Sequence, residues 1–248
     1  MGLIKSENDI RQMAESGRIA ALILKELVEA AKPGVTTRQL NDMAVRRIQE
    51  EGVKPSFLNQ GGFPAVLCTS VNEVVVHGLP SDVELQEGDI VGLDFGVVYN
   101  GWHSDTAVTV AVGEVSYEAK RIMEVAKRSL RLGIKKARPG VTTGDIGNTI
   151  QRFVEGEGYS VVRELVGHGI GRELHEDPQV PNYGRRGAGD VLKAGMVIAI
   201  EPMIINGPAD LKLARDGFGY ASPTNALTAH FEHTIAITEE GSVILTKT

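Results

Sequence analysis

The chain of 248 residues is short of cysteine, of long apolar runs and of positive charge. Its single cysteine, Cys68, rules out a disulfide bond within the chain. No apolar run reaches the ~18 residues of a membrane-spanning helix, and the N-terminal residues lack the pattern of a secretory signal. We therefore expect a protein of the cytoplasm that does not bind membranes.

Acidic residues outnumber basic ones, 32 against 26, which gives a formal net charge of -6 at pH 7. Proteins that bind nucleic acids are usually basic, so we expect no specific binding to DNA. With 42% hydrophobic and 23% charged residues, the composition is otherwise that of a globular protein able to bury a large core. No linker or low-complexity stretch divides the chain, and we expect a single domain over residues 1–248.

One short segment occurs twice in the chain. Residues 31–52 and 137–158 align without gaps, and each contains Pro-Gly-Val-Thr-Thr. In each copy a helix can end at Pro-Gly, and a threonine can cap the helix that follows. A longer helical pattern precedes each copy, over residues 6–31 and 116–137. Chance recurrence of a common helix–turn–helix sequence is the alternative, but the matching helical context favours two similar halves.

Segments typical of β-strands surround these helices. They are residues 65–71, 90–98, 106–112, 161–166, 197–204 and 233–238. Segregated helices with mainly antiparallel strands are typical of the α+β class. Because the order of helices followed by strands occurs twice, we expect two pseudo-symmetric halves, about residues 1–112 and 113–248.

A hairpin is predicted around the Asn-Gly dipeptide at residues 100–101. A two-residue loop there places Tyr99 opposite Trp102 and puts Asp94 and Asp105 on the same face of the hairpin. Their backbone positions are then diagonal neighbours, roughly 7–8 Å apart, which allows two carboxylates to hold a common object. Two exposed aspartates on a half-solvated hairpin are the alternative.

Two further acids and a histidine lie in similar surroundings. Glu201 interrupts the apolar run VIAIEPMI, Glu232 begins the strand pattern of HFEHTIAI, and His168 lies between glycines in ELVGHGIG. Acids at the ends of buried-looking strands are improbable as solvated surface groups. If all four carboxylates converged at an effective dielectric of ~20, their repulsion would be on the order of 10–20 kcal/mol, as large as the stability of a typical domain. They are therefore expected to be protonated or to surround cations.

Four carboxylates and one imidazole form an oxygen-rich set of ligands with a single nitrogen. Such a set suits divalent manganese, iron, cobalt or zinc, and differs from a structural zinc site built from cysteines. Enough oxygens are present to bridge two ions roughly 3.5–4 Å apart, the arrangement of two-metal hydrolases.

Several of these stretches resemble one enzyme family. LDFGVVYNGWHSDTAVTV, GHGIGRELHEDPQVPNYG, AIEPM and FEHTIAIT are similar to the metal-binding segments of the type I methionine aminopeptidases, and SVNEVVVHG distinguishes these from other members of the fold. The resemblance runs from about Asn8 to the C-terminus. It implies the pita-bread fold, with pseudo-symmetric halves, a central antiparallel sheet and helices on the outer face.

The resemblance also implies the metal ligands. They are Asp94, Asp105, His168, Glu201 and Glu232. Asp105 and Glu232 would bridge two divalent ions, Asp94 would chelate one ion, and His168 with Glu201 would hold the other. The expected cofactor is thus a pair of cobalt, manganese, iron or zinc ions.

Three residues are expected to act on the substrate, by the same resemblance. Glu201 would carry a proton from the attacking water to the leaving amine. His175 would donate a hydrogen bond to the substrate carbonyl as it becomes an oxyanion, and His77 would hold the scissile amide or the neighbouring backbone. Structural roles, His175 capping a turn and His77 in a loop, are the alternatives.

A closed apolar pocket for a methionine side chain is implied as well. Its expected wall consists of Phe63, Cys68, Leu174 and Phe218. The chain departs from the family at two places, because Phe218 stands where tryptophan is usual and Gln60 where tyrosine is common. Cys68 could equally be a small buried core residue.

The implied activity is removal of the N-terminal methionine from nascent proteins whose second residue is small, by metal-activated hydroxide. We expect a monomer that acts on nascent polypeptide N-termini, with Arg185 and Arg186 as a candidate contact with the ribosome. His233 is interpreted as a group that supports a ligand, and His230 is left without a role.

Two rival functions remain open. A proline-specific aminopeptidase or prolidase of the same fold could use the same five ligands, although such enzymes usually carry an additional N-terminal domain. A catalytically inactive relative could instead serve as a binding module, but such relatives generally lose ligands.

Overall fold

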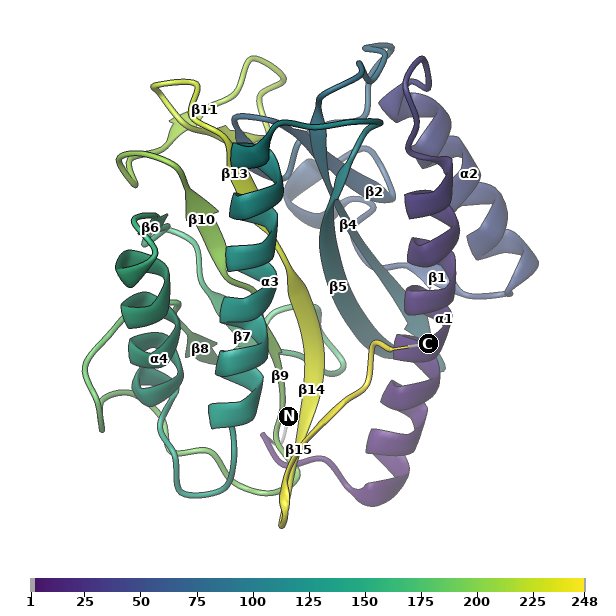
Figure 1. The fold of residues 1–248 in the computed structure, drawn as a ribbon. Coiled ribbons are helices and arrows are strands. Elements are labelled where there is room, and N and C mark those ends of the chain that lie inside the picture. The colour runs from purple at the N-terminus through teal and green to yellow at the C-terminus, as the bar shows by residue number, and fades with distance from the viewer. Residues whose placement is uncertain (1–2, 248) are drawn as a thin grey trace.

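The computed structural model describes residues 3–247. Four α-helices lie in this range: α1 (Glu7–Ala30), α2 (Thr37–Glu50), α3 (Tyr117–Lys136) and α4 (Thr143–Gly156). Helices α1 and α3 lie across one face of the central sheet, with α2 beside α1 and α4 beside α3 (Figure 1). None of the described helices is long and apolar enough to cross a membrane.

The caps that the repeated segment predicts are confirmed. Thr36 and Thr142 each accept a hydrogen bond from the backbone amide three residues along, at the start of α2 and α4. The glycines before them, Gly34 and Gly140, adopt positive φ angles of 85° and 82°, which other residues rarely tolerate. Ser6 forms the expected capping box at the start of α1. The division of one domain into two similar halves stays a prediction.

A nine-stranded antiparallel sheet forms the centre of the molecule, in the order β1-β4-β5-β14-β9-β7-β8, with β2 paired to β4 and β15 to β14. Its strands are β1 (Lys54–Pro55), β2 (Leu67–Val71), β4 (Ile90–Tyr99), β5 (Trp102–Ala111), β7 (Gly167–Gly169), β8 (Glu176–Val180), β9 (Val197–Ile200), β14 (Glu232–Thr238) and β15 (Gly241–Ile244). The mixture of helices with an antiparallel sheet confirms the α+β class.

Two small three-stranded sheets lie beside the central one. The first joins β13 (Thr228–His230), β10 (Met203–Ile205) and β6 (Ser160–Val161), and the second joins β11 (Lys212–Leu213), β12 (Tyr220–Ala221) and β3 (Val74–Val76). A short 3-10 helix, η1 (Gln60–Gly62), precedes β2.

The predicted hairpin has the predicted register. Ile90 pairs with Ala111 and Tyr99 with Trp102, without a bulge between them. Both turn residues, at positions 100 and 101, have positive φ angles of 50° and 77°. A two-residue turn of this kind matches the twist of the strands it joins, so the register follows directly from the Asn-Gly dipeptide.

Two strand predictions are wrong in part. The expected strand over residues 161–166 ends at Val161, because the chain leaves the sheet at an exposed charged pair, Arg163 and Glu164. The expected strand over residues 197–204 is interrupted between β9 and β10 at Pro202. Proline has no amide hydrogen to donate to a neighbouring strand.

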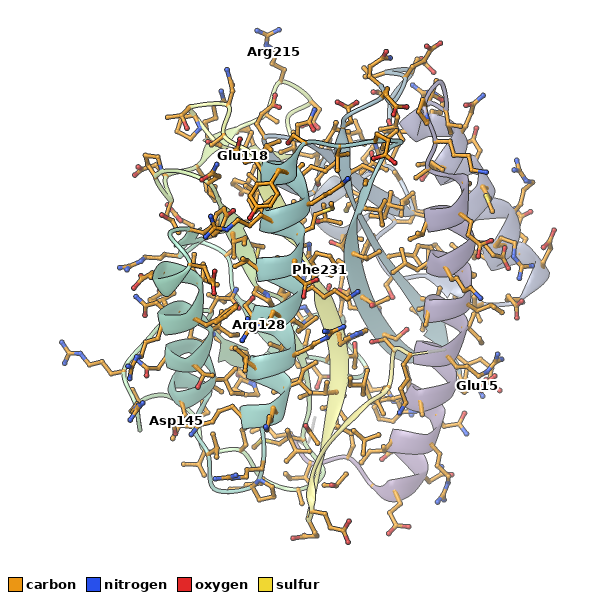
Figure 2. All side chains as sticks on the ribbon, in the orientation of Figure 1. Glu15, Glu118, Arg128, Asp145, Arg215 and Phe231 are labelled. Carbon is orange, nitrogen blue, oxygen red and sulfur yellow. The ribbon has the colours of Figure 1, made fainter. Side chains whose placement is uncertain are left out.

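Successive side chains of β4 point to opposite faces of the sheet, one facing the hydrophobic core and the other facing the predicted metal ligands. Val91, Leu93, Phe95 and Val97 belong to the hydrophobic core beneath α1 and α2. Asp94 lies between them in the sequence and therefore projects from the opposite face of the sheet. On α3, Glu118 and Arg128 are exposed while Phe231 is buried in the core against that helix, as Figure 2 shows.

Candidate metal centre

Three neighbouring strands bring three carboxylates to one place on the sheet. Asp94 of β4 and Glu232 of β14 both lie opposite Ala107 of β5, on its two sides. Asp105 of β5 lies opposite Gly96 of β4, so it shares the face of Ala107. Because alanine and glycine are small, space remains between the carboxylates for another group.

His168 and Glu201 reach the same place from β7 and from the end of β9. The Nε2 atom of His168 lies 3.5 Å from Oε1 of Glu201 and 3.9 Å from Oδ2 of Asp105. Its Nδ1 atom lies 2.8 Å from the carbonyl oxygen of Gly169. A proton on Nδ1 satisfies that carbonyl and leaves the lone pair of Nε2 directed at the carboxylates, as a metal-ligating histidine requires.

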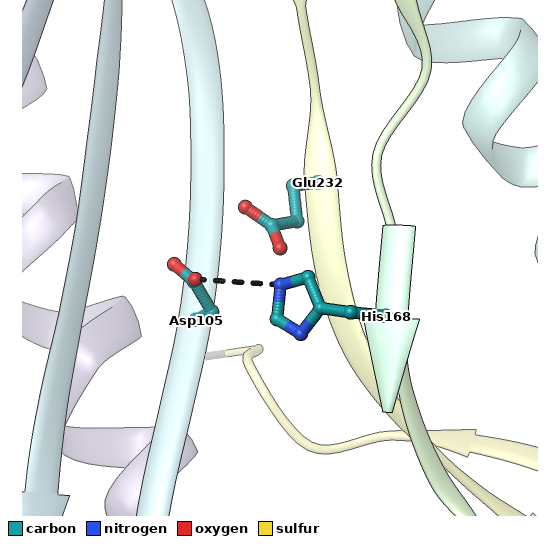
Figure 3. Close-up of side chains that lie close together, drawn as sticks. All are labelled: Asp105, His168 and Glu232. Carbon is teal, nitrogen blue, oxygen red and sulfur yellow. Dashed lines mark ion pairs between the residues drawn. The ribbon is translucent and has the colours of Figure 1, made fainter. Parts of the chain in front are cut away.

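The structure thus brings all five residues expected as ligands into one cluster. Asp105, His168 and Glu232 each offer a ligand atom, and these atoms lie within 4.8 Å of one another (Figure 3). All three side chains are buried. Asp94 adjoins this group through the β4–β5 pairing, and Glu201 adjoins it through His168.

The burial of these acids disturbs their ionisation. Burial raises the pKa of Asp94 from its ordinary value of 3.8 to about 7. Burial, and then the neighbouring carboxylates, raise the pKa of Asp105, Glu201 and Glu232 well above their ordinary values. Burial lowers the pKa of His168 to about 4, so its ring is neutral at neutral pH.

Several of these oxygens also lack hydrogen-bond partners. Within residues 3–247, Oδ1 of Asp94, Oδ1 of Asp105 and Oε1 of Glu232 are buried and form no hydrogen bond. A buried acceptor without a partner is costly, and a buried charge without a counterion is more so. A divalent cation would satisfy both needs, and the mainly oxygen ligand set suits it. The buried Asp, Glu and His side chains therefore fit a metal site.

A cavity of about 510 Å³ adjoins the cluster. Every residue that the family resemblance places in the methionine pocket or beside the substrate lines it: Phe63, Cys68, His77, Leu174, His175 and Phe218. Gln60, one of the two departures from the family, lines it too. The rings of Phe63 and Phe218 meet edge to face, with centroids 5.5 Å apart. Cys68 and Leu174 are buried in the same apolar cluster. The roles of these residues stay predictions.

The surroundings of Cys68 disfavour its reactive thiolate form. Burial, and then the charge of Asp94, raise the pKa of the thiol well above its ordinary value. Cys68 lies directly opposite Asp94 in the β2–β4 pairing. A thiol that remains protonated at neutral pH is a poor nucleophile, because only the thiolate is nucleophilic.

Two exposed histidines, His77 and His175, line the cavity. The ring of His175 meets that of His168 edge to face, with centroids 4.5 Å apart. His77 has a φ angle of 59°, in the left-handed region that a residue other than glycine rarely adopts. Strained backbone of this kind concentrates at functional sites, where the surrounding structure maintains it.

Sequence reasoning missed two residues that contact Glu201. The side-chain amide of Asn182 donates to the backbone carbonyl of Glu201 at 2.9 Å. The buried Nε2 atom of His230 lies 3.7 Å from Oε2 of Glu201. For His230 the sequence offered only its nearness to Glu232, because the two residues lie at the end of β13 and the start of β14 and not within one strand. For Asn182 the sequence offered no signal.

The interpretation of His233 as a support for a ligand is wrong. Its Nδ1 atom lies 3.0 Å from the hydroxyl of Thr246. His233 lines a separate groove between α1 and α3. It follows Glu232 directly on β14, so its side chain projects from the other face of the sheet.

Comparisons with known proteins agree with this geometry. Residues 11–239 match the model of metallopeptidase family M24. The methionine aminopeptidase of Clostridium perfringens is 47% identical over 99% of each chain. The crystal structure of the methionine aminopeptidase from Thermotoga maritima has a TM-score of 0.97 and 43% identity, and the match covers 99% of each chain.

A prolidase from Pyrococcus horikoshii has the same fold at greater distance. Its structure has a TM-score of 0.81 and 28% identity, and the match covers 99% of this chain but 64% of the prolidase. Together the two kinds of structure confirm the expected pita-bread fold. The chain therefore belongs to metallopeptidase family M24, and within it to the methionine aminopeptidases.

Proposed function

We propose that this metallopeptidase removes the N-terminal methionine from nascent polypeptides whose second residue is small. The observation that carries the proposal is the cavity of about 510 Å³ that joins an apolar wall to the buried acids and His168. An apolar side chain can enter this cavity while its own carbonyl group comes to rest beside the charged cluster. Relatives named methionine aminopeptidase, 41–47% identical to this chain, support the same substrate.

The five clustered side chains would hold two divalent ions, of manganese, iron, cobalt or zinc. Asp105 and Glu232, which lie on neighbouring strands, would each contribute a carboxylate, Asp94 would contribute one from β4, and His168 with Glu201 would supply the remaining ligands. When bound, such ions polarise a carbonyl group and make hydroxide available near neutral pH.

The protein's own side chains position the substrate and move the proton. His175, at the mouth of the cavity beside His168, donates a hydrogen bond to the oxygen of the first carbonyl as negative charge develops there. Glu201 borders both the cavity and the ligand cluster, so its carboxylate can accept a proton from the attacking water and pass it to the departing amine nitrogen. His77 holds the backbone of the scissile bond.

The apolar wall selects methionine. Phe63 and Phe218 present an edge-to-face pair to the cavity, and Leu174 and Cys68 close its sides. A flexible thioether fits such a wall and gains a small additional contact with the aromatic rings. Phenylalanine is smaller than tryptophan, so Phe218 leaves more space in the pocket than the tryptophan usual in the family would. The pocket therefore also accommodates substrates with slightly larger side chains.

A substrate comparison tests this function. The purified protein, supplied with manganese or cobalt, is given Met-Gly-Met-Met and, separately, a dipeptide whose second residue is proline. We expect release of methionine from the tetrapeptide and little cleavage of the dipeptide. Exclusive cleavage of the dipeptide would identify a prolidase instead. Absence both of bound metal and of activity would favour a binding module that catalyses nothing.

A protein that acts on nascent chains would meet them at the ribosome. Arg185 and Arg186 are exposed on the loop after β8, and we infer that they contact the ribosome. Co-sedimentation of the protein with ribosomes, compared with a variant in which both arginines are replaced by alanine, tests the contact. The cytoplasmic location and the monomeric state stay predictions.

A further inference from the structure

The loop that carries His175 is closed by the side chain of its neighbour. His175 is the last residue between β7 and β8, and Glu176 is the first residue of β8. Oε1 of Glu176 accepts hydrogen bonds from the backbone amides of Arg172, at 2.8 Å, and of Glu173, at 3.2 Å. The carboxylate thus joins both ends of a short loop, and the position of His175 depends on its orientation.

The other oxygen of this carboxylate is held from the N-terminal segment. Nζ of Lys5 lies 2.6 Å from Oε2 of Glu176, and the side chains of Lys5 and Glu176 are only 4% and 15% exposed. Lysine is almost never so deeply buried unless it is paired. Burial alone would raise the pKa of Glu176, but Lys5 and the loop amides together lower it below its ordinary value.

The backbone fixes Lys5 independently of this ion pair. Its amide donates to the carbonyl oxygen of Gly195 at 2.8 Å, and Ser6, which caps the N-terminus of α1, follows it directly. Gly195 has a φ angle of 89°, and a Cβ atom there would lie 3.0 Å from the carbonyl oxygen of Lys5. The backbone that carries the ammonium group is therefore held by contacts other than the ion pair.

The start of the loop is also attached to rigid elements. The guanidinium of Arg172 lies 3.8 Å from the centroid of the Trp102 ring and donates to the carbonyl oxygens of Asn100 and Gly101. The amide of His103 donates to the carbonyl oxygen of Gly171 at 2.9 Å. The loop is thus attached to the β4–β5 hairpin at one end and to Lys5 at the other.

We propose that Lys5 and Glu176 are positioning residues for His175, so that a side chain before the first helix sets the geometry of the reaction. This inference rests on the role assigned to His175 in the proposed function. The hydrogen bond from His175 to the carbonyl oxygen depends on distance and angle, and a misplacement of about 1 Å can reduce a rate by about 100-fold. Loss of the ammonium group frees the carboxylate of Glu176 to rotate, and the loop then loses its fixed amide contacts.

A set of variants tests the proposal on the metal-loaded enzyme with Met-Gly-Met-Met as substrate. Lys5→Met keeps the length of the side chain without its charge, and Lys5→Arg keeps the charge. Lys32→Met is the matched control, because Lys32 is exposed and pairs with no acid in the described chain. We expect Lys5→Met to lower kcat about 10-fold with KM and metal content little changed, Lys5→Arg to restore most of kcat, and Lys32→Met to equal wild type.

A double variant separates positioning from general support of the fold. In the background of His175→Ala, Lys5→Met should cause no further loss of kcat, because the residue through which Lys5 acts is already absent. A full additional 10-fold loss would overturn the proposal, and so would wild-type kcat in Lys5→Met alone.

Two further outcomes keep the test decisive. If Lys5→Met does not fold, Glu176→Gln replaces it: this change keeps an acceptor for the loop amides but removes the charge that pairs with Lys5. Unchanged kcat in Glu176→Gln would overturn the inference. If His175→Ala itself retained full turnover, the proposed role of His175 would fail, which is a result distinct from failure of the ion pair.

Discussion

Removal of the metal ions should destabilise this protein far more at about pH 8 than at about pH 5.5. The reason lies in the buried acids, which repel one another when they are ionised and have no cation between them. In the metal-free protein burial raises the pKa of Asp94 from 3.8 to about 7, and Asp105, Glu201 and Glu232 shift in the same direction.

The sign follows from the direction of the shift. A carboxyl group whose folded-state pKa is raised favours folding while it stays protonated, and this contribution is lost as the pH rises through the folded pKa. For Asp94 the loss occurs between its ordinary value of 3.8 and about 7. A shift of about three units corresponds to about 4 kcal/mol, of which about 2 kcal/mol falls between about pH 5.5 and about pH 7. The other acids add to this loss.

The assay is urea unfolding of the chelator-treated protein at both pH values, with and without added manganese. We expect the metal-free protein to lose about 2 kcal/mol or more between about pH 5.5 and about pH 8, and the manganese form to lose much less. Asp94→Asn should remove a large part of the loss, because the amide has the shape of the acid without its charge. Asp42→Asn, at an exposed position on α2, is the control and should leave the loss unchanged.

Two results would refute this reasoning. In the first, the free energy of unfolding of the metal-free protein stays level or increases as the pH is raised. This result would show that the acids do not meet in a buried site that excludes water. Asp94→Asn with the full wild-type loss would show that Asp94 contributes nothing to it, whatever the other acids do.

Three further predictions concern single residues. His168→Ala should lower metal affinity and kcat together, metal affinity by at least about 10–100-fold, as measured by metal titration and turnover; undiminished metal binding would remove His168 from the ligand set. His175→Ala should lower kcat by about 100-fold while metal content stays near wild type, and unchanged turnover would contradict its contact with the developing oxyanion. Gly169→Ala places a Cβ atom 2.0 Å from the carbonyl oxygen of Asp177, so it should separate β7 from β8. We expect it to destabilise the protein by about 1–3 kcal/mol in urea unfolding and to weaken metal binding. Wild-type stability and wild-type metal binding would show that the strands can adjust.

Local chemistry made much of the structure predictable from the sequence. The caps at Thr36 and Thr142 depend on residues within three positions, and the register of the β4–β5 hairpin depends on a two-residue turn. Within that hairpin the alternation of side chains assigned Asp94 and Asp105 to one face. The grouping of Glu201, Glu232 and His168 with them was expected from the resemblance of their segments to the methionine aminopeptidases; burial alone predicted only that converging acids would need cations between them.

Contacts between distant segments were decided only by the tertiary structure. Residues 162–166 have a strand-like composition but leave the sheet, and His233 faces away from the ligands although it adjoins Glu232. The ion pair of Lys5 with Glu176 joins residues 171 positions apart, and no periodicity or turn signal connects them. The sequence by itself determined helices, turns and the faces of strands, because these depend on neighbours along the chain. The folded chain decided which faces meet, because packing and burial depend on segments that the local pattern does not relate.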